Sequence, residues 1–138
     1  MKQFLLILLC VSYINVNYGQ TITEVKKEDD EGKIFNKVEV DASFPGGDSA
    51  WSHFLKFNLN PNVPANNGAD KGTYTCIVKF IVSRDSSVSD ITCEKDPGWD
   101  ICHEAIRLIK QSGKWNPARQ NGRIVNAYHR QSFTYQVE

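Results

Sequence analysis

The segment 74–82 places the tightest constraint on the fold, because every second side chain in it is apolar. One face of the segment is wholly apolar and the other is mixed, as in a strand of an antiparallel sheet with one covered face. A polar turn follows at 84–87, and residues 88–94 return as a partner strand. The pattern therefore predicts a β-hairpin. Its apolar face carries Tyr74, Cys76, Val78, Phe80 and Val82.

Two amphipathic helices flank this hairpin in the sequence. The first is capped by Asp48 or Ser49 and runs for about three turns. The second covers residues 99–112, with Gly113 at the position after its end, where a left-handed residue is favoured. Each helix has a single apolar stripe and can cover one face of a sheet. The stripes are Trp51, Phe54, Leu55 and Leu59 in the first helix, and Cys102, Ala105, Ile106 and Ile109 in the second.

Two further strands complete the predicted domain. Residues 38–40 alternate briefly, and residues 127–137 form a last strand after the strong turn signal Asn121-Gly122. The order is therefore (short β)–α–β–β–α–β. We predict an α+β fold in which two helices pack on one face of a three-stranded antiparallel sheet. The expected core is built around Trp51, Phe80, Ile106, Trp115 and Phe133.

The N-terminal segment has the features of a secretory signal peptide. One lysine precedes the apolar run FLLILLCV, and Asn17-Tyr18-Gly19 ends the segment. We expect residues 1–19 to be removed before Gln20, so that the mature protein is exported. An uncleaved inner-membrane anchor is the less favoured interpretation, because Asn15 and Asn17 interrupt the apolar run. Residues 20–37 are predicted to be a flexible charged arm, and residues 38–138 the folded domain.

The charge of the chain excludes one class of function. Sixteen Lys and Arg balance sixteen Asp and Glu, so a nucleic-acid binder that relies on bulk positive charge is not expected. The distribution is uneven, with a net charge of −4 over residues 20–48 and +4 over residues 110–138. The C-terminal quarter is therefore the natural place for an anionic partner, although a solvated basic face explains it equally well.

No motif in the sequence predicts an enzyme, a cofactor or a metal site. The sequence contains no GxSxG nucleophile elbow, no HExxH zinc-protease motif and no glycine-rich nucleotide-binding loop. Export leaves Cys76, Cys93 and Cys102, an odd number that suggests one disulfide and one thiol. We predict that Cys93 and Cys102 form the disulfide, since Asp-Pro-Gly at 96–98 lets the chain fold back. Cys76 then remains as a buried thiol on the apolar face of its strand.

Several stretches together resemble the C-terminal domain of TonB-type energy transducers, in the short form common in Bacteroidetes. The resemblance covers residues 38–138. Its most specific part is Lys114-Trp115-Asn116-Pro117-Ala118 with Gln120-Asn121-Gly122-Arg123. Weaker support comes from Val38-Glu39-Val40 with Phe44-Pro45-Gly46-Gly47, from Gly72-Thr73-Tyr74, and from Glu104-Ala105-Ile106-Arg107-Leu108-Ile109-Lys110.

The resemblance implies a periplasmic module that binds peptides. Domains of this family capture the N-terminal TonB box of an outer-membrane receptor as an added strand, a mode called β-augmentation. The strand at 127–137 corresponds to the binding edge, and Tyr128, Arg130, Ser132 and Thr134 are the residues expected to border a docked peptide. The alternative is an envelope interaction module without a transport role, which contacts peptidoglycan or protein. The sequence leaves open whether the domain forms a homodimer.

Overall fold

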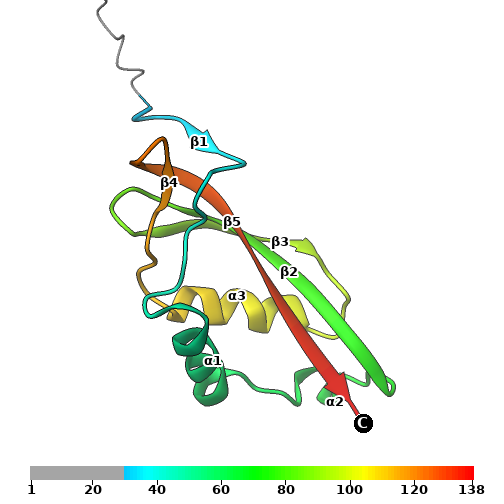
Figure 1. Cartoon of the computed structure of the whole chain (residues 1–138). Coiled ribbons are helices and arrows are strands. Elements are labelled where there is room, and N and C mark those ends of the chain that lie inside the picture. The colour runs from blue at the N-terminus through cyan, green and yellow to red at the C-terminus, as the bar shows by residue number, and fades with distance from the viewer. Residues whose placement is uncertain (1–29) are drawn as a thin grey trace, which may run out of the picture.

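A computed structural model describes residues 30–138 (Figure 1). The predicted signal peptide at 1–19 and residues 20–29 of the predicted arm lie outside the described residues. In chain order the elements are β1 (Ile34–Phe35), α1 (Gly47–Asn58), α2 (Val63–Asn66), β2 (Gly72–Val82), β3 (Val88–Lys95), α3 (Ile101–Gln111), β4 (Ala118–Gln120) and β5 (Arg123–Val137).

The sheet has five strands rather than the three that the sequence predicted. Its main path runs β1–β5–β2–β3, and β4 pairs with β5 outside this path. β1 is parallel to β5 whereas the other pairs are antiparallel, so the sheet is mixed. The α+β class is confirmed. The prediction of a purely antiparallel three-stranded sheet is wrong, because two strands too short to show an alternating pattern join β5.

The short strand predicted at 38–40 is also wrong, since Val40 forms only an isolated bridge with Arg119. Among residues 30–138 the first strand is β1, which lies inside the segment predicted to be a flexible arm. An ion pair of 2.8 Å between Arg123 and Asp30 holds this segment at the start of β5. The folded part of the chain therefore begins before residue 38.

Both predicted turns are present. Asn121 and Gly122 have φ angles of 51° and 71°, which is the left-handed pair that a two-residue hairpin requires. This turn joins β4 to β5, so the last strand begins at Arg123 and is four residues longer than expected. The β2–β3 hairpin is confirmed, with Ser86 at the turn in the left-handed region.

Each helix differs slightly from its prediction. α1 begins at Gly47, before the predicted caps, because the Gly47 N–H donates to the Phe44 carbonyl at 2.8 Å and closes a turn there. The buried stripe of α3 includes Ile101 and Leu108, whereas Ile106 is only half-buried and is a wrong core prediction. The reason is rotational: a stripe that starts at Ile101 continues at i+4, i+7 and i+8 and leaves position 106 on its flank.

The core lies between the helices and the inner face of β2 and β5. Trp51, Phe80, Trp115 and Phe133 are buried as predicted. Trp115 is at the centre of this group, with ring centroids 5.1 Å from Phe80 and 5.3 Å from Trp51. Such edge and tilted ring contacts add to the stabilisation from burial.

A buried carboxylate joins α3 to the end of α1. Glu104 accepts two hydrogen bonds from Arg107, at 2.7 and 2.8 Å, and one from the Asn60 N–H at 3.0 Å. Arg107 also donates to the Asn58 carbonyl at 2.8 Å. The hydrogen bonds from Arg107 hold the pKa of Glu104 below its usual value. This network fixes the loop after α1 against α3 by the charge-assisted bonds that a buried ion pair needs.

Candidate functional site

One edge of β5 is the main candidate site. β5 pairs with β2 along its whole length from Ala127 to Val137. On its other edge, β1 pairs only with Asn126 and Ala127. Within residues 30–138, no strand pairs with that edge beyond Ala127. In the described part of the chain, residues 128–137 of β5 therefore form an edge without a partner strand, which we call the open edge (Figure 1).

The hydrogen-bond pattern shows which backbone groups face the open edge. The Ser83 N–H donates to the Ser87 carbonyl at 2.9 Å, so the backbone groups of Ser83 face β3. Backbone groups alternate along a strand, and the pairing of β2 with β5 has no register shift. Even-numbered residues of β2 therefore face odd-numbered residues of β5. The even-numbered residues of β5 direct their N–H and C=O groups to the open edge, and these are Tyr128, Arg130, Ser132, Thr134 and Gln136.

The four predicted contact residues thus lie at the open edge with outward backbone groups. Their side chains are on the face opposite the core, and those of Tyr128, Arg130 and Thr134 contact β2 or β3. The Lys79 ammonium lies 4.1 Å from the centre of the Tyr128 ring, and the Arg130 Nε donates to the Glu94 carboxylate at 2.8 Å. The Thr134 and Thr75 hydroxyls are 3.0 Å apart.

The Arg130 interaction leaves the open edge unobstructed. Arg130 reaches across β2 to β3, and its hydrogen bonds lower the pKa of Glu94, which therefore stays ionised. The guanidinium is drawn away from the position that an added strand would take. Recognition at the open edge therefore depends first on the backbone.

The second edge of the sheet is different. Within the described residues, the outer edge of β3 also has no partner strand. The pairing of β3 with β2 shifts register twice, and Asp90 in β3 has a left-handed φ of 49°. Such bulges twist an edge and prevent another strand from adding to it. The chain thus protects one edge of its sheet and leaves the other regular.

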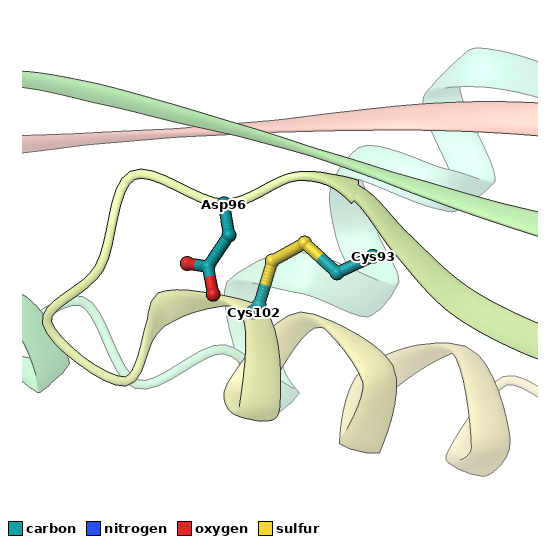
Figure 2. A group of neighbouring side chains, drawn as sticks. All are labelled: Cys93, Asp96 and Cys102. Atoms are coloured by element: carbon teal, nitrogen blue, oxygen red, sulfur yellow. A yellow bond between two sulfur atoms is a disulfide. The ribbon is translucent and has the colours of Figure 1, made fainter.

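The predicted disulfide between Cys93 and Cys102 is present, with the Cα atoms 6.0 Å apart (Figure 2). The Asp96 carboxylate lies beside the two sulfur atoms, and these three groups could together hold a metal ion only if the bond were reduced. The Asp96 carboxylate instead accepts a hydrogen bond of 2.8 Å from the Gly98 N–H. Cys76 is a buried thiol, as predicted. Burial raises its pKa to about 11, which removes it as a nucleophile.

A shallow groove on α1 was not predicted from the sequence. It has a volume of about 690 Å³ and is lined by Phe44, Gly46, Ser49, Ala50, His53, Phe54, Phe57 and Asn58. Its most exposed apolar side chain is Phe57, which is 69% exposed. Phe57 stands off the predicted stripe of the helix, and this was the signal that could have indicated an apolar surface there.

Among residues 30–138, none of the helices has the length and apolar character needed to cross a membrane. No family model, curated protein or solved structure matches the chain.

Proposed function

We propose that this protein is a periplasmic peptide-binding module that takes up an extended segment of a partner along the open edge of β5. The partner is an outer-membrane receptor, and the segment is its N-terminal TonB box, in TonB-dependent transport across the membrane. The observation that carries the proposal is the contrast between the two edges. β5 offers ten residues in regular register, from 128 to 137, whereas β3 is bulged.

Backbone hydrogen bonds give this site affinity without strict sequence requirements. Five residues of the open edge present both an N–H and a C=O to an incoming strand. At a net value of about 1 kcal/mol for each bond, these ten groups contribute about 10 kcal/mol. Ordering ten residues of a flexible segment costs about 10–20 kcal/mol. Side-chain contacts must therefore supply the remaining stabilisation.

The test is direct binding of synthetic TonB-box peptides to the mature chain, measured by calorimetry. Ser132→Pro removes an N–H that faces the open edge but leaves the pairing with β2 intact, so it should abolish binding and preserve the fold. Ser132→Ala keeps the N–H and serves as the matched control. A folded proline variant that binds as tightly as the wild type would refute the proposal.

A second measurement does not depend on the stability of the proline variant. A peptide with N-methyl groups on alternate amides can pair through only one of its edges, so one phase of methylation should block binding and the other should not. Equal binding of both methylated peptides would contradict addition as a strand. Sedimentation of the protein with purified sacculi, without peptide binding, would support the alternative of a peptidoglycan-contact module.

A further inference from the structure

Three side chains of the kinds that bind metal ions meet where β3 connects to α3. Cys93 is near the end of β3, Asp96 follows the strand, and Cys102 lies in the first turn of α3 (Figure 2). The two sulfur atoms and a carboxylate oxygen of Asp96 all lie within 4.8 Å of one another. Thiolates and carboxylates are both zinc ligands in proteins. Among residues 30–138, no other three His, Cys, Asp or Glu side chains are close enough to share an ion.

The Asp96 carboxylate is oriented without being neutralised. Its Oδ1 accepts the 2.8 Å hydrogen bond from the Gly98 N–H. In the described part of the chain, no Lys, Arg or His forms an ion pair with this carboxylate. Carboxylates that bind a metal are themselves commonly held by such a hydrogen bond. The second oxygen of Asp96 is therefore available to a cation.

The two sulfur atoms have a backbone neighbour in common. The Lys95 carbonyl oxygen lies 3.2 Å from the Cys93 Sγ and 3.6 Å from the Cys102 Sγ. After reduction of the disulfide, both thiols can donate to this oxygen, which keeps them beside Asp96. A tetrahedral zinc ion, with Zn–S of about 2.3 Å and Zn–O of about 2.1 Å, places its ligand atoms about 3.6–3.8 Å apart. Rotation of the two cysteine side chains can provide this spacing while their Cα atoms stay 6.0 Å apart.

The local chain has the form of a zinc-binding turn. Two residues separate Cys93 from Asp96, which is a common spacing for the first pair of zinc ligands. Residues 98–100, with successive left-handed φ angles, return the chain so that Cys102 meets this pair. Because Asp stands where a second Cys is usual, no motif in the sequence indicated the site.

We propose that the reduced chain binds one zinc ion through Cys93, Asp96 and Cys102, with water in the fourth position. A dithiol reductant gives two electrons and two protons to the disulfide and is itself oxidised to a disulfide. Zn²⁺ then replaces the two thiol protons, which pass to the solvent. The ion joins β3 to α3 where the disulfide did, so this junction is fixed in both redox states. The site is separate from the open edge and does not depend on peptide binding.

The test is a titration of the mature chain, without an affinity tag, with Zn²⁺ against a coloured chelator. The chain is reduced and then freed of reductant under nitrogen. We expect one Zn²⁺ for each reduced chain and none for the oxidised chain. Co²⁺ added to the reduced chain should give the visible absorption of a tetrahedral thiolate site. The Cys93→Ala/Cys102→Ala variant retains the thiol of Cys76 and should bind neither ion.

Two single variants assign the third ligand. Asp96→Asn keeps an oxygen for the Gly98 N–H but removes the anionic ligand. It should weaken Zn²⁺ binding by the reduced chain at least about tenfold, since even groups that only orient a ligand are worth about 10–100-fold. Asp100→Asn is the matched control in the same turn. The Asp100 carboxylate lies 3.5 Å from the His103 Nδ1 and is not one of the three ligands, so its loss should leave the affinity unchanged.

The outcomes decide the proposal in either direction. A reduced chain that binds no Zn²⁺, or an oxidised chain that binds it equally well, would overturn it. Equal affinities of Asp96→Asn and Asp100→Asn would also overturn it, because the carboxylate of Asp96 would then not be a ligand. Circular dichroism follows folding throughout the titration. If reduction alone unfolds the chain, Zn²⁺ should restore the folded signal, and failure to restore it would equally refute the site.

Discussion

Removal of the disulfide between Cys93 and Cys102 should destabilise the domain by a predictable amount. The bond connects β3 to the first turn of α3 across nine positions of sequence. Within this ring, Gly98, Trp99 and Asp100 have successive φ angles of 86°, 59° and 62°. A left-handed conformation costs about 1–2 kcal/mol for a residue with a side chain. The disulfide therefore helps to hold residues 98–100 in a left-handed turn, which the chain would leave more easily without the bond.

The magnitude follows from the size of the ring. Closing a loop of about ten residues lowers the entropy of the unfolded chain by about 9 cal/mol/K, which is about 2.7 kcal/mol at 25 °C. For a domain of about 100 residues, 1 kcal/mol corresponds to about 4 °C in Tm. We therefore expect the Cys93→Ala/Cys102→Ala double variant to melt about 10 °C below the wild type.

Urea unfolding of the wild type and of the double variant, with and without a reducing agent, checks this account. The reducing agent should lower the stability of the wild type to that of the variant and should leave the variant unchanged. Cys76 cannot contribute to the effect, since it is a free thiol buried in the core. A difference below about 1 kcal/mol, or equal sensitivity of both proteins to reduction, would refute the reasoning.

Three further predictions concern the folded domain and its processing. Gly46→Ala should lower the free energy of unfolding by about 2 kcal/mol or more, because φ of Gly46 is 89° and the new Cβ would lie 2.7 Å from the Cβ of Ala50. Gly47→Ala is the control: its Cβ would meet no atom within 4 Å, so it should lower the free energy of unfolding less in the same urea assay. Burial lowers the pKa of His129, so the free energy of unfolding should be highest above the unfolded pKa of about 6.5 and fall as the pH decreases below it. His129→Gln should flatten this pH profile, and an unchanged slope would exclude His129 as its source. The intact mass of the exported protein should equal that of a chain that starts at Gln20. Recovery of the full chain in the inner membrane would contradict cleavage.

The sequence by itself determined the elements whose signal is local. The alternation at 74–82 required a strand with one apolar face, and the structure has β2 there. The Asn121-Gly122 turn was evident from two residues, because few other pairs adopt two left-handed conformations in succession. The disulfide was also predictable, since the short segment between Cys93 and Cys102 limits where their Cα atoms can lie.

The tertiary structure decided the features that depend on residues distant in sequence. β1 consists of two residues and is a strand only because Asn126 and Ala127 are beside it. The bulges of β3 arise from its pairing with β2, so no local pattern shows them. The direction of the backbone groups along β5 is likewise fixed by the register of β2. A strand has the same alternation whichever edge is free, and only its neighbours determine that the N–H of Ser132 faces the open edge.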